Sequence, residues 1–445
     1  MYGLSRGSRS ASRCVRGWLT QSRLLLYGST MIVIYAIVLG MWAWTTDGFQ
    51  RSDVARPGID FAVFWVASHV LLHGSPWQVY SHLAFAKAEA MLLPTFQLSS
   101  FLPWLYPPAF LFAVAPLALL PLAVSYLLFV GVSVLLFTGV TLRLSGLGQA
   151  LGSSRVAALF VAGSPSVFVA ALVGQNSLLT AAFAALAVHW VDRKPVLGGL
   201  CIGLLAIKPQ MAMVFPFVLI AAGAWRAFAV AAISALSITA LGLLAGGMQT
   251  LHLFLLNAEF LGSVVIEHLF HFWRASPTTF AALRISGVGL TFAQLGQAWV
   301  AIAAIAAACQ VWRRSRDARL RCAALVVSTL IANPYVWHYE LAWLGVALAC
   351  LVSLGFDEGW LRGEQAVQAF AWLLPLYEYF NPYWGLPQIG PIVLLVALLV
   401  ISRRMRATAE GTFSSNNVIA AQWTQRAAPD RPWGLNAARS GSNGG

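Results

Sequence analysis

The chain has 445 residues, of which 59% are hydrophobic and only 10% are charged. A soluble domain carries about 25% charged residues, so this composition excludes a water-soluble globular protein. The net charge of +13 is typical of some nucleic-acid-binding proteins. Here, however, the basic residues lie at the ends of apolar stretches rather than along one polar face, so we expect no nucleic-acid partner.

Long apolar stretches recur along the chain and predict its membrane-spanning helices. A helix needs roughly 20 apolar residues to cross the hydrocarbon core of a bilayer, which is about 30 Å thick. The stretches that suit such helices are Leu24–Trp44, Leu122–Leu142, Val156–Val173, Leu178–Val191, Phe228–Ala245, Phe292–Trp312, Ala323–Ala332, Leu341–Leu354 and Ile389–Ile401. They lack the alternation of membrane β-strands. We therefore predict an all-α, polytopic membrane protein with about 10–13 transmembrane helices.

The first apolar stretch follows a basic segment. Five arginines precede it: Arg6, Arg9, Arg13, Arg16 and Arg23. A cleaved signal peptide has a shorter apolar core that ends at small residues, whereas this stretch is longer and ends in two tryptophans. We predict an uncleaved first span, with residues 1–23 in the cytoplasm.

The other basic residues predict which loops lie inside the cell, because loops rich in Lys and Arg stay cytoplasmic. The inside segments are marked by Arg143, Arg155, Asp192–Lys194, Arg226, Arg313–Arg321, Asp357–Arg362 and Arg403–Arg406. This scheme makes residues 45–106 the first outer loop, residues 24–403 the multi-span domain, and residues 404–445 a disordered cytoplasmic tail. It requires two short helices, Val196–Ile207 and Pro209–Gly223, broken at Lys208. Pro107–Pro121 is a candidate re-entrant stretch.

The same scheme places many polar residues at the outer face, although none of them was used to build it. They are Asp60, Tyr106, Gln175, Asn176, Lys208, Glu267, His268, His271, Arg274, His338, Glu340 and Glu378. Those numbered 267 to 274 lie within a predicted outer loop, residues 247–289. Polar groups close to a membrane are costly and tend to be functional. Their convergence indicates an active cavity that opens outward, in the cell's inner (plasma) membrane.

Asp60 precedes an aromatic-rich segment whose periodicity predicts an interfacial helix over residues 61–73, stopped by Gly74. Asp60 then stands at the N-cap, where a carboxylate accepts backbone hydrogen bonds. The alternative is a general base that accepts a proton from an attacking sugar or lipid hydroxyl. Asp is a weak base, so this role requires a good leaving group such as a phosphate ester.

Lys208 interrupts an otherwise apolar stretch and is followed at once by a proline. One interpretation is a lysine that extends to the membrane interface. The other is a cation that neutralises a phosphate group at a helix break, at the depth of Gln175 and Asn176. His338 is either a packed interfacial residue or a catalyst, with Glu340, Asn333 and Arg274 as expected neighbours at the outer face.

Other chemistries have weak sequence support. His268 and His271 with Glu267 have spacing that suits a metal pair, but no HExxH motif occurs, and we expect no metal. No GxxxxGK[ST] motif is present, so ATP-driven transport is not expected. We expect no cofactor.

A set of motifs occurs in an order that resembles glycosyltransferase family 87. The set is Asp60 with its aromatic helix and Gly74–Tyr80, then Tyr106-Pro-Pro108 with Ala115–Pro121, Gly174-Gln-Asn176, Ile207-Lys-Pro-Gln210 and Asn333–Tyr339. The likeness covers most of residues 55–345. Members have the GT-C fold and are polyprenyl-phosphate-mannose-dependent α-1,2-mannosyltransferases.

This resemblance implies a metal-independent, inverting transfer of a sugar from a polyprenyl phosphate to a hydroxyl of a lipid or cell-envelope glycan. It maps the catalytic base to Asp60. It implies substrate binding by Lys208 and His338, to which we add Tyr106, Gln175, Asn176, Arg274 and Glu340. Asp60 is followed by Phe-Ala-Val-Phe-Trp where many members have Leu-x-Val-Tyr. This departure affects the expected sugar pocket, so mannose is taken as the family's default sugar and not as a deduction from these residues.

Two other classes remain open at this stage. A secondary transporter would also have broken helices and an intramembrane cation, but it should show internal repeats, and we find none. A non-catalytic component of envelope polysaccharide assembly would need no ionised base, and its outer loops would tolerate replacement of Asp60.

Overall fold

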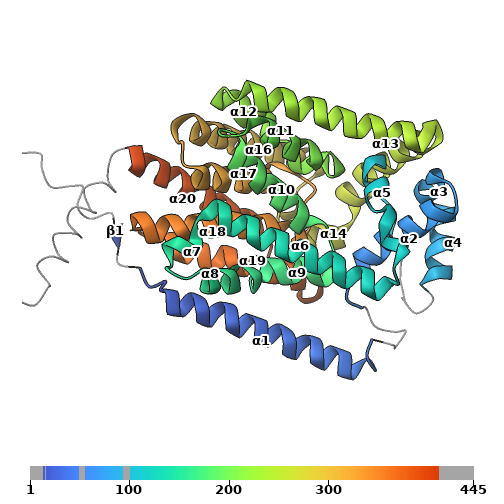
Figure 1. Ribbon diagram of the computed structural model, residues 1–445, viewed down its shortest axis with the longest axis horizontal. Coiled ribbons are helices and arrows are strands. Elements are labelled where there is room, and N and C mark those ends of the chain that lie inside the picture. The colour runs from blue at the N-terminus through green and yellow to red at the C-terminus, as the bar shows by residue number, and fades with distance from the viewer. Residues whose placement is uncertain (1–13, 16, 50–55, 94–100, 410–445) are drawn as a thin grey trace, which may run out of the picture.

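The computed structural model describes residues 14–15, 17–49, 56–93 and 101–409. These residues are almost entirely helical (Figure 1). The exception is an antiparallel pair of two-residue strands, β1 (Cys14–Val15) and β2 (Trp360–Leu361). The prediction of an all-α architecture is confirmed.

The first half of the chain contains thirteen of these helical elements up to the break at Lys208. They are α1 (Gln21–Thr45), α2 (Ile59–His73), α3 (Pro76–Tyr80), α4 (His82–Leu92), α5 (Pro108–Ala113), the 3₁₀ helix η1 (Ala115–Leu119), α6 (Leu122–Ser145), α7 (Leu147–Ala150), α8 (Ser154–Ala162), α9 (Pro165–Val173), α10 (Ser177–Trp190), α11 (Pro195–Gly203) and the 3₁₀ helix η2 (Leu204–Ile207).

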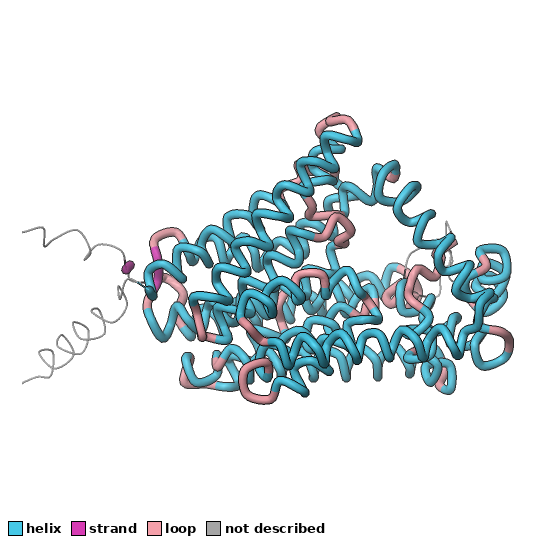
Figure 2. The backbone as a smooth tube through the Cα atoms, turned by 90° about the horizontal axis from the view of Figure 1, so that it is seen from above, coloured by secondary structure: helices cyan, strands magenta, loops and turns pink. Residues whose placement is uncertain are grey.

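The second half continues from that break to the last described residue. Its elements are the 3₁₀ helix η3 (Pro209–Ala212), α12 (Phe215–Ala222), α13 (Trp225–Phe260), the π-helical η4 (Leu261–Ile266), α14 (Phe270–Ala275), α15 (Thr279–Ile285), α16 (Leu290–Arg314), α17 (Ala318–Ala332), the 3₁₀ helix η5 (His338–Leu341), α18 (Ala342–Glu358), α19 (Glu364–Trp384) and α20 (Gly390–Ala409). Figure 2 shows how little of the traced backbone lies outside helices.

Five helical segments in the described part of the chain are long and apolar enough to cross a membrane: Gln21–Thr45, Leu122–Ser145, Trp225–Ser263, Leu290–Arg314 and His338–Glu358. The bent pair α8 and α9 makes a sixth if it forms one span. Several shorter apolar helices accompany them, among them α2, α10 and α12. The multi-pass character is confirmed, whereas the count of 10–13 crossings stays a prediction.

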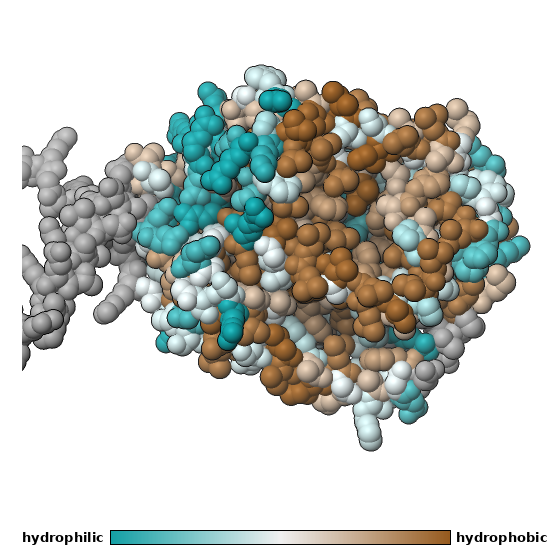
Figure 3. Space-filling view, viewed as in Figure 1, coloured by the Kyte–Doolittle hydropathy of each residue, from teal (hydrophilic) through white to brown (hydrophobic). Residues whose placement is uncertain are grey.

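The apolar helices differ in what covers them. In four of the long segments only 17–22% of the apolar window is buried within the protein, whereas in His338–Glu358 the share is 89%. Apolar faces that the protein leaves exposed need lipid around them. Figure 3 shows a broad hydrophobic surface across the middle of the molecule, with hydrophilic residues gathered at its two ends.

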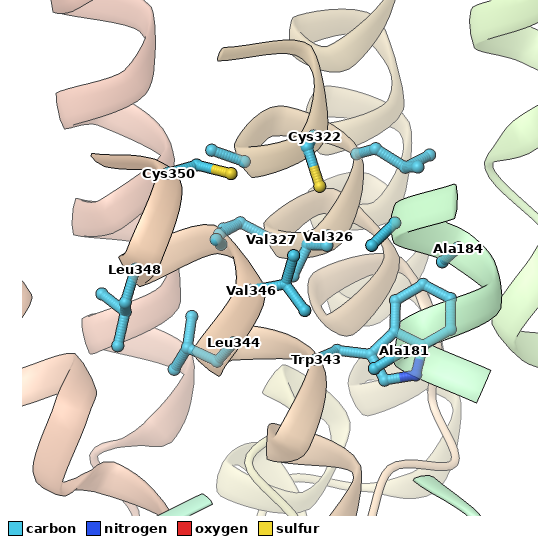
Figure 4. Packing of buried hydrophobic residues seen from close by; sticks show 14 of the residues in the cluster. Ala181, Ala184, Cys322, Val326, Val327, Trp343, Leu344, Val346, Leu348 and Cys350 are labelled. Carbon is cyan, nitrogen blue, oxygen red and sulfur yellow. The ribbon is translucent and has the colours of Figure 1, made fainter. Parts of the chain in front are cut away.

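α17 and α18 form the centre of the core. Every residue of α17 from Leu320 to Ala332 is buried, as expected for a helix that is surrounded by protein rather than lipid. Figure 4 shows Val326 and Val327 of α17 packing beside Val346 of α18, and Trp343 of α18 lying beside the small Ala181 of α10.

The predicted inside and outside segments lie at opposite ends of the molecule. α2, α3 and α4, all from the predicted outer loop 45–106, lie at one end, and β1 and the last turns of α20 lie at the other (Figure 1). Ion pairs join the predicted inside loops to one another: Arg321 with Asp192, Arg319 with Asp357, and Arg404 with Glu358. Which membrane face each end meets stays a prediction.

Two predictions about where helices are continuous were wrong. Val156–Val173 is not one helix but α8 and α9, bent by 49°, because Pro165 lacks an amide hydrogen and disfavours helix at Ser164. The predicted loop 247–289 is largely helical, since α13 continues to Phe260 across Gly247, where φ is 78°. The predicted apolar stretch had ended at Ala245.

The end of the chain also differs from the prediction. α19 covers a segment where no apolar stretch was predicted, because two prolines and several buried polar residues interrupt its hydrophobicity. α20 continues to Ala409, so the first residues of the predicted disordered tail are helical, and Arg404 is fully buried against Glu364. Residues 410–445 lie outside the described residues, as do residues 1–13 of the predicted cytoplasmic segment.

Candidate active site

Asp60 lies in the first turn of α2 and not at its N-cap. Gly58 is the N-cap, with a left-handed φ of 79°, and its amide donates to the carbonyl of Leu172 at 2.7 Å. The helix therefore begins two residues earlier than predicted, because Gly58 can adopt a conformation that few residues tolerate. The N-cap interpretation of Asp60 was wrong, whereas Gly74 ends the helix as predicted.

The turn between α9 and α10 places an amide against this carboxylate. Gly174 ends α9 with a φ of 78°, and the Gln175 side chain follows it. Gln175 Nε2 donates to Asp60 Oδ2 at 2.9 Å, and Gln175 Oε1 accepts from the Tyr106 hydroxyl at 2.7 Å. Three segments that are far apart in the sequence are thereby joined through Gln175.

Lys208 lies at the predicted break, between η2 and η3. It is buried, with 3% of its surface exposed. Its Nζ forms an ion pair with Glu340 Oε1 and donates to Asn176 Oδ1 at 3.2 Å. The ammonium also lies 5.5 Å from the ring centroid of Tyr106. A cation held by a buried carboxylate is not a lysine that extends to the membrane interface, so the structure contradicts that interpretation.

His338 and Glu340 share the short helix η5, and both are buried. The His338 ring lies 5.2 Å from the ring of Tyr379 on α19. Three buried polar atoms of Asn176, His338 and Glu340 have no hydrogen-bond partner within the described residues: Asn176 Nδ2, His338 Nδ1 and Glu340 Oε2. Such atoms are rare in protein interiors, and at a site they indicate groups available to a bound molecule or water.

The surroundings of Asp60 change its acidity. Burial raises the pKa of Asp60 to about 6, while the Gln175 hydrogen bond and the charge of Lys208 lower that pKa and the charge of Glu340 raises it. Burial is the dominant cause, since it disfavours the charged form. At neutral pH Asp60 is therefore still mostly ionised, and its carboxylate is a stronger base than that of an ordinary aspartate.

The structure thus brings together six of the eight residues predicted for the site through direct contacts: Asp60, Tyr106, Gln175, Asn176, Lys208 and Glu340. His338 is on the same short helix as Glu340. Arg274 instead lies over the ring of Phe270 and donates to the carbonyl of Leu386, and within the described part of the chain no hydrogen bond, ion pair or ring contact joins it to the other seven.

Tyr339 was missed as a site residue. Its ring centroid lies 5.3 Å from Lys208 Nζ, so it forms a second aromatic face against the cation. The sequence signal was its position between His338 and Glu340, two residues that were selected.

The arrangement suits proton transfer next to an anionic group. Asp60 supplies a base, Lys208 supplies a positive charge, and Asn176 supplies an amide with an unpaired donor. Within residues 14–15, 17–49, 56–93 and 101–409, no three His, Cys, Asp or Glu side chains are placed to hold a metal ion.

Comparison with known proteins gives one match. The model of glycosyltransferase family 87 matches residues 104–334, slightly more than half of the chain. Tyr106, Gln175, Asn176 and Lys208 lie inside the matched region, while Asp60, His338 and Glu340 lie outside it. No curated protein and no solved structure matches the chain.

Proposed function

The chain belongs to glycosyltransferase family 87, and we propose that it transfers a sugar, by default mannose, from a polyprenyl-phosphate-sugar to a hydroxyl of a lipid or cell-envelope glycan. The chain is thereby a membrane glycosyltransferase. The donor, the acceptor and the mechanism are parts of the proposal. The observation that carries them is the placement of a basic carboxylate, Asp60, in one contact network with the buried cation Lys208.

The transfer requires one bond to form and one to break at the anomeric carbon. The acceptor oxygen attacks this carbon while its proton passes to the Asp60 carboxylate. The bond from the anomeric carbon to the phosphate oxygen breaks, and its electron pair remains on the phosphate. Attack opposite the leaving phosphate inverts the anomeric centre, and Asp60 later returns the proton to water.

The residues around Asp60 have separate parts in this reaction. Lys208 and the free Asn176 amide stabilise the phosphate, whose negative charge increases as the bond breaks. Gln175 holds the Asp60 carboxylate in place, and Tyr106 holds Gln175. His338 contacts the donor or the acceptor. We further propose that this site opens toward the periplasm or cell exterior from the inner (plasma) membrane.

Replacing Asp60 by Asn tests the catalytic assignment. The substitution keeps the size of the side chain and an oxygen that accepts from Gln175, but it removes the proton acceptor. We expect kcat to fall by roughly 10²–10⁴-fold with normal expression. The measurement is the transfer of radiolabel from polyprenyl-phosphate-mannose to extractable product in membranes that contain the protein.

Asp47→Asn is the matched control. Asp47 is exposed and lies in the same predicted outer loop with a positive φ of 51°, a conformation that Asn also tolerates. This variant should retain full activity. An Asp60→Asn variant that transfers the label at the native rate would falsify the role of Asp60 as the base. Parallel assays with polyprenyl-phosphate-glucose identify the sugar.

A further inference from the structure

The partner of Lys208 is a carboxylate on a distant segment of the chain. Glu340 lies on η5, and its Oε1 pairs with Lys208 Nζ, with 3% of the Glu340 side chain and 4% of the Lys208 side chain exposed. The second oxygen of Glu340 is buried without a hydrogen-bond partner in the described part of the chain. The cation that the proposed function assigns to the phosphate is thus already paired with an internal anion.

This pairing has a consequence for any phosphate that approaches Lys208. A phosphate brings a second negative group to a lysine that already has one, and like charges in a poorly solvated site repel strongly. The repulsion by Glu340 differs between the donor substrate and the phosphate product. The donor phosphodiester carries one negative charge, whereas the product phosphate monoester carries about −1.5 to −2 at neutral pH.

We propose, on the basis of the proposed function, that Glu340 competes with the phosphate for Lys208 and thereby promotes release of the polyprenyl phosphate product. Glu340 acts through Lys208, so it is a positioning residue and not a group that touches the reacting atoms. Glu340 also compensates the buried charge of Lys208 before the donor binds. Without this carboxylate, Lys208 would be an unpaired buried charge, which is costly. The product, with the greater charge, is opposed more strongly than the donor.

Binding of polyprenyl phosphate alone tests this role without any catalysis. The purified full chain in detergent or nanodiscs is titrated with radiolabelled polyprenyl phosphate, and the Kd is compared among variants. Glu340→Gln leaves the buried Lys208 without its anion, so we expect the product to bind about tenfold tighter or more. Multiple-turnover kcat should fall while the first turnover proceeds at the native rate or faster, because release becomes limiting.

A double-mutant cycle shows whether the effect passes through Lys208. Lys208→Met should weaken product binding, and adding Glu340→Gln to it should restore little of the affinity. Glu259→Gln is the matched control, since Glu259 is exposed on α13 and its variant should bind like the native chain. If Glu340→Gln does not fold, Glu340→Asp draws the carboxylate back by one carbon and should also tighten binding, though less.

The outcomes separate the two proposals. Native protein that folds but does not bind polyprenyl phosphate contradicts the proposed function. Native protein that binds it, with equal or weaker binding by folded Glu340→Gln or Glu340→Asp, overturns the role of Glu340. An equal gain in the Lys208→Met background overturns the route through Lys208.

Discussion

Gln175 connects the base to the rest of the site by a single amide group. Its Nε2 donates to Asp60 at 2.9 Å, and this hydrogen bond lowers the Asp60 pKa, partly offsetting the effect of burial. Since Asp60 must be ionised to accept a proton, kcat/KM should increase with pH through a midpoint near 6 and level off above it. Well below that midpoint, kcat/KM should fall about tenfold for each pH unit, because the protonated carboxyl cannot accept the proton.

Replacing Gln175 by Leu removes that hydrogen bond and keeps a side chain of similar size. The Asp60 pKa should then increase, so the acid limb of the kcat/KM profile should move to higher pH. The measurement is initial transfer rates from pH 5 to 9 at low donor concentration. Gln294→Leu, an exposed glutamine on α16 that bonds Glu267, is the control. An unmoved limb in Gln175→Leu argues that Asp60 does not set the profile.

The sequence was sufficient to select most of these residues but not to predict their contacts. Asp60, Gln175 and Lys208 were selected because polar groups in an apolar chain are few and because their motifs have a familiar order. The contact between Asp60 and Gln175 joins positions 115 residues apart, and a single sequence does not encode such a pairing by spacing. Glu340 was selected as a neighbour of His338, and its pairing with Lys208 was missed.

At the scale of helices, apolar length predicted the isolated spans well and the broken ones poorly. α1, α6 and α16 match their predicted stretches closely, because their sides are lipid-facing and uniformly apolar. α19 was missed, because its buried polar residues face protein and lower its hydropathy. The break at Lys208 was predicted, since a charge followed by proline marks it in the sequence.

The end of α9 positions the Gln175 turn against α2 at very short range. A Cβ added to Gly174 would lie 2.5 Å from Phe61 Cβ, and its φ of 78° is unfavourable for other residues. Gly174→Ala should therefore push α2 away from the turn and separate Asp60 from Gln175. We expect a loss of more than about 1 kcal/mol in stability, the cost of the left-handed conformation alone, together with a large loss of transfer activity.

Gly223→Ala separates backbone strain from the clash. Gly223 ends α12 with a φ of 69°, and nothing lies within 4 Å of its added Cβ. This variant should lose stability through strain alone and keep its activity per folded molecule. Thermal unfolding and the radiolabel transfer assay are compared for the two variants. Equal activity in both would show that close packing at Gly174 does not position the site.

At the scale of the whole molecule, the two polar ends have different constructions. The end with α20 is held by ion pairs, including the fully buried pair between Arg404 of α20 and Glu364 of α19. The other end holds the helices of the first predicted outer loop, with an aromatic core of its own around Phe64 and Trp104. The site residues Asp60 and Tyr106 belong to this second end, so the direction in which it faces decides where the sugar is transferred.

Cysteine accessibility measures that direction. Ala90 is exposed on α4 at the end of the molecule that holds the outer-loop helices, and Arg316 is exposed between α16 and α17, in a predicted inside loop. In a chain whose five native cysteines are replaced, Ala90→Cys should react with a membrane-impermeant maleimide in intact cells. Arg316→Cys should react only after the inner membrane is permeabilised, because arginine-rich loops remain cytoplasmic. The reverse pattern would place Asp60 on the cytoplasmic side, where the acceptor glycans of the cell envelope are out of reach.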